Sequence, residues 1–272
     1  MNTGVAILKR VIPPGAWQLL KRLKPRTWGF FGDYPTYEAA LAACGGEGYH
    51  SEEIVAKTLE GLRQLRATCE AAPERCDART QSVLAALVLP LTGRKIADRL
   101  RVLDFGGALG NLYVQVSRFL PPGLEVRWDV VETPVTAQAG KRHLADAHLT
   151  FSADLAEHEA DAYDVVISSS CLQYTDQPVE TFARLCRLST DFILLNRVPL
   201  IPGEKDRLTI QKTHPSVYSA TYPAWFFSEA HWLRLFEEHG FVVRMRWQVP
   251  EDQLELDGVW RANEGFLLQR VR

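Results

Sequence analysis

A glycine-rich turn is the part of this 272-residue sequence whose residue types most clearly suit ligand binding. It reads Asp104-Phe105-Gly106-Gly107-Ala108-Leu109-Gly110, between a predicted strand (residues 101–104) and a predicted helix (residues 110–119). Glycine permits a tight turn and lets a ligand approach the backbone without a Cβ in the way. The start of the helix offers backbone N–H groups and the positive end of its dipole. The turn therefore predicts a ligand site that includes Asp104, Phe105, Gly106, Gly107 and Gly110.

The acid at the start of this turn discriminates between two nucleotide cofactors. A dinucleotide requires Gly-x-Gly-x-x-Gly, and alignment on Gly107 and Gly110 would place the first glycine at Phe105. A pyrophosphate at the turn would also meet the negative charge of Asp104. S-adenosylmethionine instead carries an ammonium group and a sulfonium, which a carboxylate attracts. The turn therefore favours S-adenosylmethionine as the cofactor. A nicotinamide-dependent oxidoreductase and a non-catalytic, membrane-associated binding module on the same fold are the alternatives.

The second predicted strand ends in an acid as well. Glu132 and Thr133 follow Val130-Val131, about 20 residues after the glycine-rich turn, where a carboxylate accepts both ribose hydroxyls. Both cofactors contain a ribose, so Glu132 supports the site without deciding the cofactor.

The run from Val102 to Gly110 resembles the first motif of the class I S-adenosylmethionine-dependent methyltransferases, Asp-x-Gly-x-Gly-x-Gly. Asp104, Gly106 and Gly110 match that motif, and the small residue Ala108 replaces its middle glycine. The resemblance covers residues 101–272 and implies a methyl-transferring enzyme.

Two further segments gain a role from this resemblance. The family places an acid that accepts from the adenine amino group in the region of Asp154; a helix cap or a solvated loop acid is the alternative for that residue. Residues 164–174 resemble the fourth motif, with an acid at the start of a strand and small polar residues at its end. By this resemblance Ser168, Ser169, Ser170 and Cys171 line the methionine end of the cofactor, and Gln173 and Tyr174 approach the reacting methyl.

Two segments in the N-terminal part of the sequence resemble a narrower methyltransferase family. Residues 28–34 and 48–52 are similar to a little-characterised bacterial methyltransferase family found near cell-surface polysaccharide genes. This resemblance implies a small-molecule or saccharide-type acceptor. It leaves two roles open for residues 49–52, a fold over the cofactor or a plain loop and helix cap.

Methyl transfer is an in-line displacement in which the protein supplies alignment and, for an oxygen or nitrogen nucleophile, a base. His50, Asp176, His214 and Tyr174 are candidates, and His214 and Tyr174 are the predicted catalytic residues. A structural role is the alternative for a lone loop histidine.

Asn196-Arg197 ends the fifth strand, where Arg197 either holds an anionic substrate group or pairs with an acid of the domain. The aromatic segment 218–227 either walls a pocket or plugs the sheet.

The elements that must position these residues alternate between strands and helices from residue 101 onward. This alternation predicts an α/β fold with a doubly wound, mostly parallel seven-stranded sheet. Residues 241–248 and 265–271 lack an intervening helix, so they predict an antiparallel C-terminal strand pair. Residues 1–99 read as a helical N-terminal extension, with an irregular packed loop at 28–37, and residues 100–272 as a Rossmann-like methyltransferase domain.

Composition excludes several classes of protein. Thirty-one basic and 33 acidic residues give a net charge of −2, which does not favour nucleic acid. Five cysteines without Cys-x-x-Cys spacing predict reduced thiols in a cytoplasmic protein, with no metal site. The basic amphipathic segment 7–24 is interpreted as an arm packed on the domain, with peripheral membrane contact as the alternative.

Overall fold

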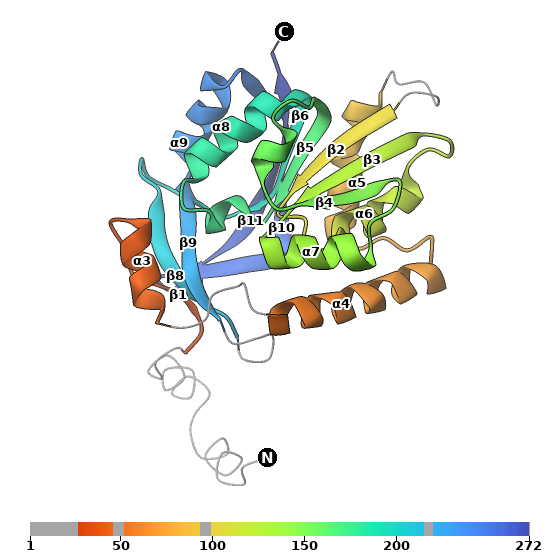
Figure 1. Cartoon of the computed structure of the whole chain (residues 1–272). Coiled ribbons are helices and arrows are strands. Elements are labelled where there is room, and N and C mark those ends of the chain that lie inside the picture. The colour runs from red at the N-terminus through yellow and green to blue at the C-terminus, as the bar shows by residue number, and fades with distance from the viewer. Residues whose placement is uncertain (1–26, 46–51, 93–98, 215–219, 272) are drawn as a thin grey trace, which may run out of the picture.

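A seven-stranded sheet forms the centre of the structure, a computed structural model that describes residues 27–45, 52–92, 99–214 and 220–271 (Figure 1). Its strand order is β10-β11-β6-β5-β2-β3-β4. Strands β2 to β6 run parallel, whereas β11 is antiparallel to both β6 and β10. The topology confirms the predicted fold class. The strands are β2 Arg99–Phe105, β3 Glu125–Val131, β4 Leu149–Ser152, β5 Tyr163–Ser169, β6 Ser189–Val198, β10 Phe241–Leu256 and β11 Val259–Arg270.

Helices connect the parallel strands, and side-chain caps fix where several of them begin. The carboxylate of Asp77 accepts from the backbone N–H of Thr80 at 2.7 Å, and the Ser228 hydroxyl accepts from that of His231 at 3.2 Å. Gly240 follows the last helix with a φ of +77°, a left-handed conformation that glycine adopts readily at helix ends. The α-helices are α3 Tyr37–Cys44, α4 Glu52–Ala71, α5 Ala78–Leu91, α6 Asn111–Val116, α7 Pro134–His143, α8 Pro178–Leu188 and α9 Glu229–Glu238.

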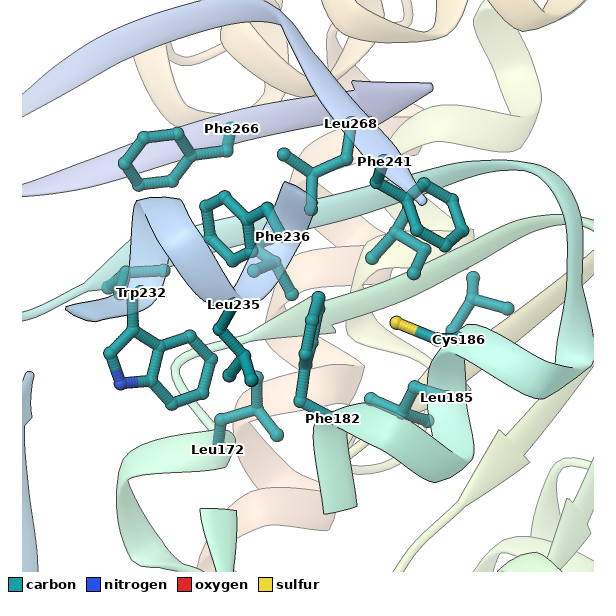
Figure 2. Packing of buried hydrophobic residues seen from close by; sticks show 14 of the residues in the cluster. Leu172, Phe182, Leu185, Cys186, Trp232, Leu235, Phe236, Phe241, Phe266 and Leu268 are labelled. Carbon is teal, nitrogen blue, oxygen red and sulfur yellow. The ribbon is translucent and has the colours of Figure 1, made fainter. Parts of the chain in front are cut away.

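Alternating strand residues bury two separate apolar clusters, one on each face of the sheet. Helices α8 and α9 cover one face, where the Phe182 ring lies 5.6 Å from that of Trp232 and 5.4 Å from that of Phe236 (Figure 2). Val83 of α5 and Val116 of α6 belong to the cluster on the other face. Both faces of the parallel strands are therefore buried, which leaves their ends as the accessible places.

A second, four-stranded sheet lies beside the first, and the sequence did not predict it. Its order is β1-β8-β9-β7, with β1 Gly29–Phe31, β7 Leu200–Ile201, β8 Arg207–Lys212 and β9 Thr221–Ser228. Helix α3 contacts β8 and β9 on one side of it (Figure 1). The expectation of an irregular loop at residues 28–37 was wrong for β1, because three residues form a strand only through their pairing with distant β8.

The two C-terminal strands form a hairpin that is longer than predicted. Asp257 and Gly258 turn the chain with φ values of +51° and +80°, the signature of a tight hairpin turn. At the tip, the guanidinium of Arg207 from β8 pairs with the Asp257 carboxylate and also donates to the carbonyl of Gly32 at 2.9 Å. The hairpin thus reaches from the central sheet to the second sheet.

No helix in the described ranges is both long and apolar enough to cross a membrane. The basic amphipathic segment 7–24 lies outside the described residues, as do His50 and Ser51.

Gly140 should tolerate no side chain, because α7 packs closely on β4. A Cβ at Gly140 would lie 2.4 Å from a ring carbon of Phe151. Such overpacking costs about 1–3 kcal/mol, more than the gain of about 1 kcal/mol that alanine brings to a helix interior. We expect Gly140→Ala to lower the free energy of unfolding by about 1–2 kcal/mol, measured by chemical denaturation.

Gly61→Ala in α4 is the matched control, since nothing lies within 4 Å of a Cβ at that position. It should raise the free energy of unfolding by up to about 1 kcal/mol. A Gly140→Ala variant at least as stable as the parent would contradict the packing of α7 on β4.

Candidate active site

A cavity of about 1250 Å³ opens at the carboxyl ends of the parallel strands. Open α/β sheets bind ligands at this edge. The cavity brings together most of the residues predicted from the sequence, and two predicted residues do not line it, Gly110 and Ser168. The predicted residues in its wall are Asp104, Phe105, Gly106, Gly107, Glu132, Thr133, Asp154, Ser169, Ser170, Tyr174 and His214.

Asp104 lies at the end of β2 with only 1% of its surface exposed. The indole N–H of Trp128 donates to its Oδ2 at 3.1 Å. Burial raises the pKa of the Asp104 carboxyl from 3.8 to about 7; the Trp128 hydrogen bond opposes this shift and the charge of Glu132 adds to it. A cationic ligand group in the cavity would favour the ionised carboxylate. The contact with Trp128 was not predicted, because it depends on the register of β2 against β3.

Gly106 and Gly107 form a cradle that only glycine fits. Gly106 has a φ of +73°, and a Cβ there would lie 2.1 Å from the Sγ of Cys171. A Cβ at Gly107 would lie 2.5 Å from the Asp104 carboxyl carbon. The turn therefore exposes bare backbone directly above the buried acid. Gly110 serves a different purpose, since its φ is +77° and a Cβ there would contact a Leu149 methyl at 3.0 Å.

Glu132 and Thr133 lie at the end of β3, next to the cradle. The Glu132 carboxylate accepts from the backbone N–H of Ala108 at 3.1 Å and from that of Thr133 at 2.8 Å. These bonds hold the carboxylate at the cavity wall. They also join the loops that follow β2 and β3.

Asp154 caps a helix, which is one of the roles that the sequence left open, and it also lies in the cavity wall. Its carboxylate caps the short helix η2 Leu155–His158, accepting from the backbone N–H of Ala156 at 2.9 Å. Asp154 also lines the cavity, and Arg184 lies 3.9 Å from its carboxylate. The cap therefore fixes an acid at the outer end of the cavity, beyond Glu132.

Of the three consecutive serines at the end of β5, Ser168 is buried in the core, whereas Ser169 and Ser170 line the cavity. The Ser168 side chain is 2% exposed and its Oγ has no hydrogen-bond partner among the described residues. Ser169 and Ser170 line the cavity, and Ser170 adopts a φ of +56°. Cys171 fills the space below Gly106, and burial raises its pKa, so it is a packing residue and not a nucleophile.

Tyr174 is held among residues of the second sheet. Its hydroxyl donates to Oε1 of Gln211 in β8 at 2.9 Å, and its ring meets that of Tyr222 in β9 edge to face at 5.2 Å. The Tyr37 hydroxyl of α3 donates to the Tyr174 carbonyl at 3.1 Å. The aromatic segment that ends in β9 thus contributes a wall to the cavity. No pattern in the sequence indicated Gln211, because its position depends on the second sheet, which the sequence did not predict.

His214 lies farther along the same wall, with its ring against that of Trp28 at 5.1 Å. Arg197 pairs with Asp252 of β10, which is the second of its two predicted roles. Asp176 is exposed and accepts from the N–H of Gln177, and it does not line the cavity. The structure therefore brings His214 and Tyr174 to the cavity and leaves Asp176 outside it.

A comparison with known protein families identifies the family of this chain. Residues 76–245 match the family described as methyltransferase domain, which spans more than half of the chain, so the chain belongs to that family. This places the chain among the methyltransferases, as the sequence predicted. No curated protein matches the chain. The narrower family associated with polysaccharide genes is not part of this finding.

Several solved structures resemble the fold. Magnesium protoporphyrin IX methyltransferase from Synechocystis PCC 6803, with bound S-adenosylhomocysteine, is 17% identical over 83% of this chain and 90% of that chain, with a TM-score of 0.46. The 1,6-didemethyltoxoflavin-N1-methyltransferase of Burkholderia thailandensis is 17% identical over 84% and 94%, with a TM-score of 0.46. Human N-acetylserotonin methyltransferase is 15% identical over 82% and 57%, with a TM-score of 0.48.

Asp104→Asn should stabilise the empty protein at alkaline pH. The folded protein keeps the Asp104 proton up to a pH of about 7, while the unfolded chain releases it near a pH of about 4. The folded state therefore binds more protons in this window, and the stability of the parent falls as the pH rises through it. Asparagine can accept the Trp128 hydrogen bond and does not titrate. We expect the free energy of unfolding of the variant to exceed that of the parent by about 2–3 kcal/mol at pH 8, and by less at pH 5.

Thermal unfolding at the two pH values measures this difference. Asp176→Asn, which alters an exposed carboxylate, is the control and should show no such pH-dependent gain. An equal gain for Asp104→Asn at both pH values would mean that this carboxyl is not the titrating group.

Proposed function

We propose that the cavity binds S-adenosylmethionine across the ends of four parallel strands. Glu132 and Thr133 would hold the ribose, and Asp154 the adenine edge. Asp104, Phe105, Gly106, Gly107, Ser169 and Ser170 would surround the amino acid end, with Gly110 and Ser168 supporting the turn and the strand from behind. When bound, the donor supplies an electrophilic methyl on a positively charged sulfur. The observation that carries this proposal is the buried Asp104 carboxyl directly beneath the bare backbone of Gly107.

The residues present fit this group chemically. A Cβ at Gly106 would collide with Cys171 and one at Gly107 with the Asp104 carboxyl, so only glycines let this acid lie directly against the turn. The Asp104 carboxyl, raised in pKa by burial, gains an attractive partner when a cation lies nearby. Glu132 offers the acceptor oxygens that ribose hydroxyls need. Each end of the donor therefore has a matching group in the wall.

We infer that the methyl acceptor is a neutral small molecule of the saccharide type, and that it binds beyond the donor, toward the second sheet. Three aromatic side chains line the cavity there, Trp28, Tyr174 and Tyr222, and Gln211 adds an amide. Aromatic faces pack against the C–H faces of a sugar ring, while amide and hydroxyl groups bond its hydroxyls. Arg197 is already paired with Asp252, which argues against an anionic group at that position.

Three broader predictions accompany this proposal. The division into a helical extension (residues 1–99) and a methyltransferase domain (residues 100–272), a cytoplasmic location, and the absence of a nucleic-acid partner stay predictions. A peripheral membrane contact would involve segment 7–24, outside the described residues.

The ribose assignment predicts a specific loss of donor affinity. Glu132→Ala removes the only carboxylate placed for the ribose hydroxyls in this assignment, so we expect the dissociation constant of S-adenosylhomocysteine to rise about ten- to a hundredfold. Isothermal titration calorimetry measures it. Glu125→Ala is the matched control, because Glu125 lies at the opposite end of the same strand and pairs with exposed Arg99. If the two variants bind the product alike, the ribose does not lie at Glu132.

The acceptor assignment predicts methylation of sugars and a role for His214 and Tyr174 in the transfer. Free sugars, glycosides and hydroxylated aromatic compounds would be incubated with labelled S-adenosylmethionine and the products analysed by mass spectrometry. With the best acceptor, we expect His214→Ala to lower kcat about 10²- to 10⁴-fold, the range of a lost general base, without weakening binding of S-adenosylhomocysteine. His143→Ala, at the exposed end of α7, is the control. Preferred methylation of an acidic compound or of nucleic acid would contradict the saccharide-type acceptor.

A further inference from the structure

Asn196, at the end of β6, presents an unexplained buried amide to the cavity. Only 3% of Asn196 is exposed, and it belongs to the cavity wall. Its side-chain oxygen Oδ1 has no hydrogen-bond partner among the described residues. A buried polar group without a partner destabilises a protein, so proteins rarely keep one without a use. Neither the sequence motifs nor the functions proposed above give Asn196 a role.

The backbone around Asn196 is shaped to hold this amide in place. The register of β6 against β11 shifts between Glu264 and Phe266, and Arg197 adopts a φ of +59° at the shift. Such bulges occur next to active sites, where they redirect a side chain. The Asn196 carbonyl also accepts from the backbone N–H of Ser170 at 2.9 Å, and Ser170 has a φ of +56°. Ser170 and Arg197 thus both adopt a positive φ, which is unfavourable for residues other than glycine, next to the hydrogen bond between Ser170 and Asn196.

The sheet order locates this amide within the cavity. Asn196 is paired in register with Ser169, and β5 separates it from the end of β2. Leu194 and Val102 belong to the same apolar cluster, so strand alternation puts Asn196 and Asp104 on one face of the sheet. The order β6-β5-β2-β3-β4 places Asn196 on the opposite side of Asp104 from Glu132. The amide therefore lies at the end of the cavity away from the assigned nucleoside position.

We propose that Asn196 binds the amino acid end of the methyl donor. A carboxamide is both an acceptor and a donor, so its Oδ1 can accept from the ammonium group while its Nδ2 donates to the carboxylate. This match to a zwitterion accounts for an oxygen that lacks a partner within the protein. The inference rests on the proposed function, in which the donor is S-adenosylmethionine.

Two ligands that differ only at the amino acid end test this assignment. S-adenosylhomocysteine carries that end, and 5′-methylthioadenosine shares its adenosine and thioether but lacks it. Asn196→Leu keeps a similar side-chain volume and removes both polar atoms. We expect the dissociation constant of S-adenosylhomocysteine to rise at least tenfold, as for a lost hydrogen bond to a charged group. That of 5′-methylthioadenosine should stay within twofold, and isothermal titration calorimetry on the full chain measures both.

Controls separate a binding role from a structural one. The empty Asn196→Leu variant should unfold at the temperature of the parent or higher, because replacing an unpartnered polar group removes a penalty. Asn196→Ser carries the same test if the leucine variant does not fold. Gln248→Leu, an exposed amide on β10, should bind both ligands like the parent.

Each outcome bears on a different claim. A parent protein that binds neither ligand would overturn the donor assignment itself. If the parent binds S-adenosylhomocysteine and Asn196→Leu binds it equally well, Asn196 does not contact the amino acid end, and its amide serves the acceptor or a water molecule. Equal losses for both ligands would also overturn the inference, because they would show that Asn196 supports the whole site.

Discussion

The burial of the Asp104 carboxyl beneath a glycine turn is the constraint on which the rest of the site depends. Removing a carboxylate from water favours its neutral form, and among the described residues one indole N–H compensates. Burial therefore raises the pKa of the Asp104 carboxyl to about 7, and a cation bound nearby would supply the missing attraction. The two glycines above Asp104 make this possible, because any Cβ at Gly107 would meet the carboxyl itself. Charge and backbone shape thus define the same end of the cavity.

The order of the strands places acidic side chains at one end of the cavity and neutral polar side chains at the other, along the carboxyl edge of the sheet. Glu132 and Asp154 lie at the ends or beyond the ends of β3 and β4, whereas Ser169 and Asn196 lie at those of β5 and β6. Backbone N–H groups donate to the carboxylates of Glu132 and Asp154 and hold both in place. Behind Asp154, a buried chain of hydrogen bonds runs from Ser152 through His158 and Tyr163 to Asp129. Since the Tyr163 hydroxyl donates to Asp129, Nδ1 of His158 donates to the Tyr163 oxygen, and in the neutral imidazole Nε2 accepts from the Ser152 hydroxyl. This network anchors η2, and with it the Asp154 cap.

The remaining wall comes from the second sheet and from the hairpin that extends the central sheet toward it. Strand β1, near residue 30, pairs with β8 near residue 210, and the hairpin of β10 and β11 joins them through Arg207 and Asp257. Arg197 and Asn263 both bind Asp252 and so secure the outer half of the same hairpin. A pocket assembled from three distant segments can vary without altering the donor end, which fits a fold that serves many acceptors.

The sequence by itself determined the alternating pattern, the glycine turn with its acid and Glu132, because these depend on local spacing and on the period of each element. It therefore predicted the main sheet and the donor chemistry. Only the tertiary structure decided what surrounds Asp104, that Asp154 also caps η2, and that Arg197 pairs with Asp252. It also decided the second sheet, because three residues such as Gly29–Phe31 carry too little pattern to specify a partner nearly 200 residues away in the chain. Contacts of that kind follow from register and packing between distant segments, which local sequence does not encode.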